Sequence, residues 1–423
     1  MTKRYLIKNA RLINGFDDHP HEAMDLLIVD STFEAVDRNI TPPEGTEIVD
    51  VSGRTVLPGL FDCHAHLGWD NIQDVGTQSV EDSVAYGAIK STLNMRRFLE
   101  AGVTTIRDLG VHWIGVEARN AVIDGITMGP RILAAGPPIT TTGGHCWWCG
   151  TEVDGADGIR HTIRVMAKRG VDLVKVIATQ AASGSKYYPG SASTSNPAYS
   201  WKEMRTLIDE AHNLGRKVTC HATTPEGAHQ VVKAGIDCIE HGTDFTEETL
   251  ERMLEQGTFV VPTMSVGWMK AHFGHLHGFT DEELQPVRKR YADPEYNSGV
   301  RKAAAAGVNI AVGTDQGSPG TPPEALVTEM FLHLHYRIAA NPMTVIQRAT
   351  AQAAILCGVD HLVGRIMPGM LADFIVVSQD PLDDIENLRF PDAVYQAGKQ
   401  VASKGHLLAE TTFYPKAAVV LAK

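Results

Sequence analysis

Two histidines near the start of the chain have the spacing of metal ligands. His64 and His66 follow the run Leu57-Pro58-Gly59-Leu60-Phe61, which is typical of a buried strand. Alternate residues of an extended chain point to the same side, so both imidazoles can reach one cation. A His-x-His pair is common by chance, so it predicts a metal site only together with further ligands elsewhere in the chain.

Further residues of this kind lie within or at the end of other strand-like runs. They are Lys175, His221, His241 and Asp315. In a parallel barrel the active residues lie at the carboxyl ends of the strands, where these side chains would meet. Packing alone rarely places four histidines, a lysine and an aspartate at one rim, so we interpret the set as a metal site.

Lys175 is unusual because it lies inside the apolar run from Asp172 to Ala178. An unpaired buried ammonium group costs several kcal/mol, so the lysine must be paired, neutral or chemically altered. A neutral lysine can capture carbon dioxide as a carbamate, which would form an anionic bridge between two metals. The alternative is a lysine whose charged end reaches the rim of the fold.

Strand-like and amphipathic segments alternate through the middle of the chain, which predicts an α/β fold with a parallel sheet. Eight such strands, most of them followed by a helix, favour a closed (β/α)8 TIM barrel. The predicted strands are Val56–Asp62, Val103–Asp108, Arg131–Gly136, Asp172–Ala178, Lys217–Ala222, Cys238–Gly242, Phe259–Thr263 and Asn309–Asp315. No GxGxxG motif opens the first helix, so nothing supports a dinucleotide-binding fold.

The two ends of the chain have a different pattern, with alternating apolar and polar residues and turn motifs. Because chain ends often lie close together, we expect residues 1–56 and 366–423 to form one small β-sandwich domain. Residues 57–365 would then form the barrel.

Composition limits the classes of partner. The chain of 423 residues has 43% hydrophobic and 21% charged residues, and its formal net charge is −12. The negative charge argues against a nucleic-acid or anionic-membrane partner and favours a small-molecule substrate. Met1–Ile7 has no apolar stretch with a cleavage site, so we expect a cytoplasmic protein.

The six cysteines are too few for a disulfide framework in a chain of this length. Only Cys146 and Cys149 have a spacing that suggests redox or zinc chemistry. A structural zinc site would need a second pair, which the sequence lacks. We therefore interpret them as two loop thiols beside Trp147 and Trp148.

Taken together, these motifs resemble the binuclear branch of the amidohydrolase superfamily, and the resemblance covers essentially the whole chain. It rests on the segment from Leu57 to His66, the strand lysine, the two later histidines, Asp315 and the tail segment Pro368-Gly369-Met370-Leu371-Ala372-Asp373. Mononuclear members have a glutamate three residues after the first of the later histidines, whereas this chain has Thr224.

The resemblance implies a role for each ligand. His64 and His66 would hold one divalent metal and His221 and His241 the other, with carboxylated Lys175 between them. Asp315 would bind a metal and move the proton of the attacking water to the leaving nitrogen. Imidazole and carboxylate ligands suit zinc best, and manganese or cobalt stays open.

Residues that contact substrate are also implied by the resemblance. His145, in a Gly-Gly-His loop, would polarise the scissile carbonyl. Tyr187 or Tyr188 would bind a substrate carboxylate, and Arg107 would either do the same or pair with Asp108. Trp148 and other tryptophans in the rim loops suggest an apolar or aromatic substrate group.

We therefore expect hydrolysis of an amide or peptide bond, in a dipeptide, an N-acyl amino acid or an ochratoxin-like aromatic amide. The alternative within the same superfamily is a cyclic-amide or lactone hydrolase. A non-catalytic scaffold is a third interpretation, which the full ligand set disfavours. Relatives of this branch form multimers, so a homo-oligomer is expected by analogy.

Overall fold

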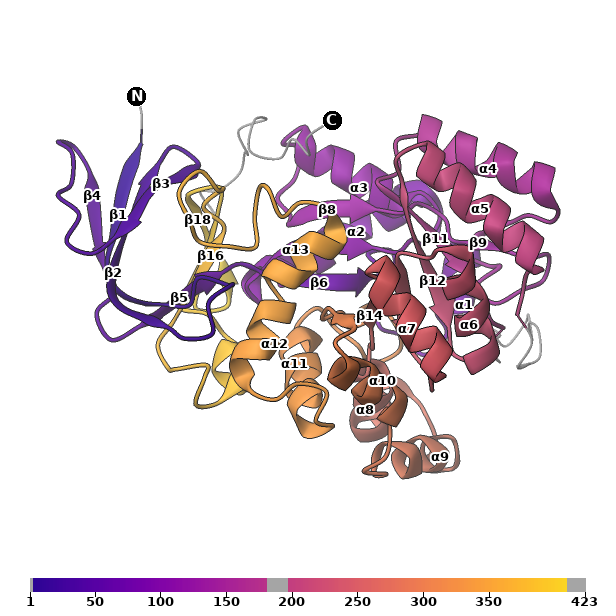
Figure 1. The fold of residues 1–423 in the computed structure, drawn as a ribbon. Coiled ribbons are helices and arrows are strands. Elements are labelled where there is room, and N and C mark those ends of the chain that lie inside the picture. The colour runs from indigo at the N-terminus through magenta and orange to yellow at the C-terminus, as the bar shows by residue number, and fades with distance from the viewer. Residues whose placement is uncertain (1–2, 181–196, 409–423) are drawn as a thin grey trace.

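The computed structural model describes residues 3–180 and 197–408. One large sheet is built from both ends of the chain and lies beside the α/β part (Figure 1). Its strand order is β19-β18-β17-β16-β5-β1-β2-β3, and β4 pairs with β1. The strands are β1 (Arg4–Leu12), β2 (His21–Val29), β3 (Thr32–Asp37), β4 (Glu47–Asp50), β5 (Thr55–Pro58), β16 (Phe374–Val377), β17 (Ala393–Gln396), β18 (Lys399–Ser403) and β19 (His406–Leu407). This terminal sheet encloses its own apolar cluster, which includes Phe33 and Phe374.

The remaining strands are parallel and form two sheets. The three-stranded sheet contains β6 (Leu60–Ala65), β7 (Val103–Asp108) and β8 (Arg131–Ala134). The seven-stranded sheet has the order β10-β9-β11-β12-β13-β14-β15. Its strands are β9 (Ile139–Thr140), β10 (Thr151–Glu152), β11 (Leu173–Ile177), β12 (Lys217–Ala222), β13 (Cys238–His241), β14 (Phe259–Val261) and β15 (Asn309–Ile310).

Backbone hydrogen bonds join both edge strands of the three-stranded sheet, β8 and β6, to the seven-stranded sheet and the segment that follows it. On one side the Asp172 amide donates to the Ala134 carbonyl, at 2.9 Å, and so connects β11 to β8. On the other side the Cys63 amide donates to the Val312 carbonyl, at 3.0 Å. A parallel bridge between Ala65 and Gln316 adds to this second junction.

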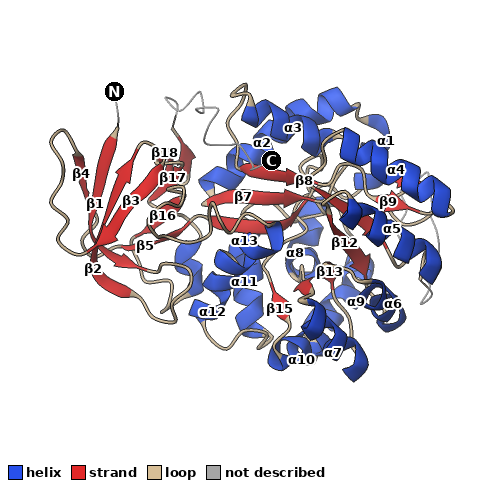
Figure 2. Cartoon of the chain, turned by 45° about the horizontal axis from the view of Figure 1, so that its top comes forward, coloured by secondary structure: helices blue, strands red, loops and turns tan. Residues whose placement is uncertain are grey.

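Helices lie around the parallel strands (Figure 2). They are α1 (Val75–Glu81), α2 (Val84–Glu100), α3 (Ile114–Ile123), α4 (Ala156–Lys168), α5 (Trp201–Asn213), α6 (Pro225–Ala234), α7 (Glu247–Gln256), α8 (Ser265–Phe273), α9 (Asp281–Tyr291), α10 (Ser298–Ala306), α11 (Ala325–His335), α12 (Pro342–Arg348) and α13 (Ala351–Cys357), with short 3₁₀ turns at Gly274–His277 and Ile385–Leu388. In the described part of the chain, none of these helices is both long and apolar enough to cross a bilayer.

The prediction of one strand from Val56 to Asp62 is wrong, because this segment belongs to two strands. The structure divides it at Gly59 into β5 of the terminal sheet and β6 of the parallel sheet. A Cβ atom at Gly59 would lie 2.2 Å from the hydroxyl oxygen of Thr104, so only glycine allows this close approach. The Gly59 amide donates to the Asp373 carbonyl, at 3.0 Å, and ties the crossing point to the tail of the chain.

The last predicted strand, Asn309–Asp315, is shorter than expected. Asn309 and Ile310 pair with β14, and the Ala311 amide still donates to the Val260 carbonyl of that strand. The Val312 carbonyl and the Asp315 amide bond to β6 instead. The Asp315 amide donates to the His64 carbonyl, at 2.8 Å. This contact places the first and last predicted ligands side by side.

Candidate active site

A cavity of about 260 Å³ opens at the carboxyl ends of the parallel strands. Its lining includes six residues predicted as metal ligands, two residues predicted to contact substrate, and several apolar residues. The first two groups are His64, His66, Lys175, His221, His241 and Asp315, with His145 and Trp148. Residues from the four strands β6, β11, β12 and β13 and from the segment after β15 therefore reach one cavity.

The first half of the site consists of His64, His66 and Asp315. One possible ligand atom from each lies within 4.8 Å of the others. His66 Nε2 is 3.1 Å and His64 Nε2 is 3.5 Å from Asp315 Oδ1, and the two Nε2 atoms are 3.3 Å apart. Two ring nitrogens and a carboxylate oxygen converging this closely form a donor set for a divalent cation.

The second half contains His221, His241 and Lys175. The ring centroids of His221 and His241 are 4.5 Å apart, and the His241 ring is 5.2 Å from the ring of His64. His221 Nε2 is buried and has no hydrogen-bond partner among the described residues. A buried nitrogen without a partner costs free energy, which a bound metal would recover.

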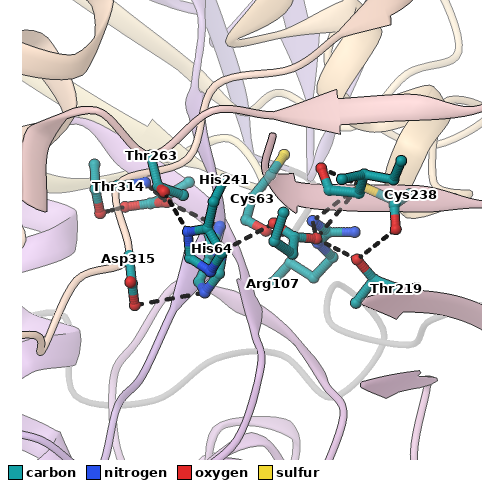
Figure 3. Close-up of polar contacts among 12 residues, drawn as sticks. Cys63, His64, Arg107, Thr219, Cys238, His241, Thr263, Thr314 and Asp315 are labelled. Atoms are coloured by element: carbon teal, nitrogen blue, oxygen red, sulfur yellow. Dashed lines mark hydrogen bonds and ion pairs between the residues drawn. The ribbon is translucent and has the colours of Figure 1, made fainter. Parts of the chain in front are cut away.

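Hydrogen bonds from the far side of each ring fix how the histidines face the cavity (Figure 3). His64 Nδ1 lies 2.8 Å from Glu240 Oε2, and His241 Nδ1 lies 2.7 Å from Thr263 Oγ1. His66 Nδ1 lies 2.8 Å from the Gly110 carbonyl oxygen, to which it donates. These contacts leave the Nε2 atoms of His64, His66 and His241 available on the cavity side.

Burial keeps several of these imidazoles neutral. It lowers the pKa of His241 to about 3, and the positive charge of His64 adds to the effect. Burial, followed by the like charge of His241, lowers the pKa of His221 well below its usual value. Only a neutral imidazole can donate its lone pair to a metal, so this environment favours coordination at neutral pH.

Asp315 is held ionised in the same environment. Burial by itself would raise the pKa of this carboxyl, but the charge of His64 and the hydrogen bond from His66 outweigh it and lower the pKa. The contact with Asp315 also raises the pKa of His66, although burial by itself would lower that pKa. Asp315 is therefore a carboxylate facing two imidazoles.

Three residues of the site have left-handed backbone conformations. His241, Thr263 and Asp315 have φ angles of 71°, 50° and 60°, and all three follow the buried core of a strand. Such conformations cost non-glycine residues of the order of 1–3 kcal/mol and concentrate at functional sites. Of the three, His241 and Asp315 line the cavity, and Thr263 contacts the far side of the His241 ring.

Glu240 is a functional residue to which the sequence interpretation gave no role. It is fully buried and contacts Arg107, His64, Thr219 and Cys238. Burial disfavours its charge, but Arg107 and His64 hold the pKa of this carboxyl well below its usual range. The sequence feature that could have identified Glu240 is an acidic residue inside an apolar parallel strand, because both faces of such a strand are normally buried.

Asp62 is a second supporting carboxyl. Its Oδ1 accepts hydrogen bonds from the Thr314 and His64 amides, at 2.9 and 3.1 Å, and its Oδ2 accepts one from the Thr314 hydroxyl. Burial raises its pKa to about 7, although these hydrogen bonds oppose the shift. Asp62 thus holds the strand of His64 against the segment that carries Asp315.

Arg107 does not line this cavity. Its guanidinium donates to Glu240 Oε1 and to the Cys63 carbonyl, at 2.5 and 2.6 Å (Figure 3). Arg107 lines a second cavity together with residues at the amino ends of β11, β12 and β13. The predicted contact between Arg107 and a substrate carboxylate is therefore not supported, because a buried counterion already occupies the guanidinium. Its alternative predicted partner, Asp108, instead accepts the Leu67 and Gly110 amides.

Of the other residues predicted to contact substrate, two line the cavity and two lie outside the described residues. His145 and Trp148 belong to the cavity wall, with ring centroids 5.9 Å apart, and the His145 ring is 4.6 Å from that of His221. The indole nitrogen of Trp148 is buried and has no partner among the described residues. Tyr187 and Tyr188 lie outside the described residues.

The sequence of this chain is similar to known hydrolases. A family model described as "Amidohydrolase family" matches residues 55–401. Ochratoxinase from Aspergillus niger is 27% identical over 381 residues, which cover 81% of this chain and 74% of the relative. The residues that the family model matches include every described residue that lines the candidate site.

Solved structures give the same result. A Xaa-Pro dipeptidase with methionine bound in its active site superimposes with a TM-score of 0.82 and 29% identity, covering 94% of this chain and 99% of the other. A prolidase in complex with N-methylphosphonate-L-proline has a TM-score of 0.84 and 25% identity, covering 95% of this chain and 100% of the other. Both similarities extend over the terminal sheet as well as the α/β part.

Proposed function

Because this chain belongs to the amidohydrolase family, we propose that it is a metal-dependent hydrolase that cleaves an amide or peptide bond of a small molecule. The observation that carries the proposal is the convergence of six potential ligands on one cavity. The hydrogen bonds at both junctions of the parallel sheets support a single closed (β/α)8 barrel around it.

The residues fit a pair of divalent metals. His64, His66 and Asp315 would hold one ion, and His221 and His241 the other, with Lys175 as a carbamate between them. The unpartnered Nε2 of His221 and the 3% exposure of Lys175 support this assignment. When bound, the metals would lower the pKa of the attacking water to roughly 7, and zinc suits these ligands best.

Two residues of the chain would act on the substrate directly. Asp315, an ionised carboxylate at the cavity wall, would accept the proton of the attacking water and return it to the leaving nitrogen. His145 would donate a hydrogen bond to the carbonyl oxygen as negative charge develops there. One such donor contributes roughly 3 kcal/mol.

The cavity also limits the class of substrate. Its wall combines Trp69, Trp148, Ile177 and Pro138 with the polar residues, so one side of the substrate would be apolar. The similar proteins include an ochratoxinase, a prolidase and a Xaa-Pro dipeptidase. We therefore propose a dipeptide or an N-acyl amino acid, including aromatic amides, as the substrate class.

A panel of Xaa-Pro dipeptides, N-acyl amino acids, lactones and cyclic imides tests this function with the zinc-loaded protein. We expect turnover of at least one linear amide, and a loss of roughly 10²–10⁴ in kcat for Asp315→Asn. Asp124→Asn, at the exposed end of α3, is the matched control and should keep full activity. Turnover of lactones or cyclic imides alone would identify a cyclic-amide or lactone hydrolase instead.

A further inference from the structure

Cys146 and Cys149 are the two ends of one tight turn in the wall of the candidate site. The Cys149 amide donates to the Cys146 carbonyl, at 3.1 Å, and the Cys149 thiol lies 3.5 Å from the same oxygen. A turn closed between residues i and i+3 keeps their Cα atoms within about 7 Å, which overlaps the range that a disulfide spans. The two thiols are also in side-chain hydrogen-bond contact with each other.

The two thiols differ in access. Cys146 lines the cavity of the candidate site, whereas Cys149 is fully buried behind it. Both belong to an apolar cluster with Trp69 and Trp148. A small polar reagent that enters the cavity therefore meets Cys146 first.

The pKa shifts of the two thiols also favour Cys146 as the first to react. The hydrogen bond from Cys149, followed by the charge of His145, lowers the pKa of the Cys146 thiol, although burial opposes this. The pKa of Cys149 is raised by its contact with Cys146 and by burial. Cys146 is therefore the nucleophile and Cys149 the thiol that follows it.

The backbone of this turn is conformationally constrained. Cys146 has a φ of 61°, a left-handed conformation that non-glycine residues adopt at a cost. The next turn is equally constrained, because a Cβ at Gly150 would lie 2.4 Å from the Pro138 carbonyl oxygen. The strained turn places the Cys146 side chain on the cavity side while Cys149 stays behind it.

We propose that Cys146 and Cys149 form a thiol site that reacts with small hydroperoxides and closes into a disulfide. The Cys146 sulfur attacks one peroxide oxygen, the O–O bond breaks, and a sulfenic acid and one water or alcohol form. The Cys149 sulfur then attacks the sulfenic sulfur, forms the S–S bond and releases a second water. Two thiols are oxidised and one hydroperoxide is reduced.

This reaction would act on the substrate-binding wall. His145 precedes Cys146, and Trp148 lies between the two cysteines, so closing the disulfide fixes the turn that carries both rings. Oxidation thus offers a means of changing the cavity without touching the metal ligands. It goes beyond the hydrolytic function and does not depend on it.

Peptide mapping by mass spectrometry after brief treatment of the folded protein with hydrogen peroxide tests the proposal. We expect a peptide containing Cys146 and Cys149 that has lost two hydrogens and regains them with a dithiol reductant. In Cys149→Ser the reaction should stop at a sulfenic acid on Cys146 that dimedone captures. In Cys146→Ser neither product should form.

The control concerns Cys63 and Cys357, which are also in side-chain contact. The Cys357→Ser variant removes that competing pair and should leave the reaction at Cys146 unchanged. Circular dichroism checks that each variant is folded. The proposal is overturned if Cys146 and Cys149 remain thiols while Cys357 is oxidised, or if Cys149 is oxidised equally well without Cys146.

Discussion

At the scale of single residues, the site depends on carboxylates that never reach the cavity. Glu240 connects His64 to Arg107, so one buried acid both orients an imidazole and is itself held by a guanidinium. Such partners fix the tautomer of a ligand histidine and raise its basicity. The candidate metal site therefore includes a second layer of residues behind the proposed ligands.

Replacing Glu240 by glutamine should weaken metal binding. The amide carries no charge and is a poorer acceptor for His64 Nδ1–H, so we expect an affinity loss of about 10–100-fold. Competition with a chromophoric chelator measures it. Glu251→Gln on the exposed face of α7 is the control, and equal affinity in both variants would show that Glu240 does not orient the ligand.

At the scale of elements, the site depends on how closely two segments approach. Gly313 precedes Thr314 and Asp315, and a Cβ atom there would lie 2.7 Å from the His64 amide nitrogen and 2.6 Å from a methyl of Val261. The contact with backbone cannot be relieved by a side-chain rotation. A glycine at this position is what allows Asp315 to lie beside His64.

Gly313→Ala should therefore separate Asp315 from His64 and His66. We expect a large loss of metal occupancy, measured by elemental analysis after dialysis against a zinc buffer. Gly158→Ala in α4 is the matched control, since the new methyl meets only a methyl of Val153 and helix propensity favours alanine by up to about 1 kcal/mol. Normal occupancy in Gly313→Ala would contradict this role.

The sequence predicts the parts of this site that depend on local pattern. Apolar runs with polar residues near their ends locate His221 and His241, and a lysine inside an apolar run marks Lys175. It does not reveal the Glu240–Arg107 pair, whose members are 133 residues apart. Their contact depends on the register between strands, which no local pattern encodes.

At the scale of the whole molecule, one buried ion pair joins the terminal sheet to the parallel strands. Nη1 of Arg131, in β8, lies 2.7 Å from Oδ2 of Asp373, which directly precedes β16. The two side chains are only 3% and 2% exposed. Asp373 also accepts the Ala397 amide, at 2.6 Å. The family-like tail segment that ends at Asp373 thus has a structural role at this junction.

Breaking this pair should destabilise the protein strongly. Removing one partner leaves an uncompensated buried charge, so Asp373→Asn should cost about 3–5 kcal/mol, while the double variant Arg131→Met with Asp373→Asn should cost less than the sum of the singles. Thermal unfolding measures both. Additive effects would show that the two groups do not interact.

The large-scale organisation was only partly predictable. The sequence predicts an α/β fold with a β domain from both termini because each region has its own periodicity. It misses the division at Gly59, because the residues on both sides of that glycine are equally apolar. The close approach of Thr104, which enforces the crossing, is a tertiary contact.

Anomalous diffraction from crystals of the zinc-loaded protein tests the central claim most directly. We expect two metal peaks in the cavity, one beside His64, His66 and Asp315 and one beside His221 and His241, with density for a carbamate on Lys175. In two-metal sites the ions lie roughly 3.5–4 Å apart. An empty cavity in metal-loaded crystals, or metal bound elsewhere, would contradict the account.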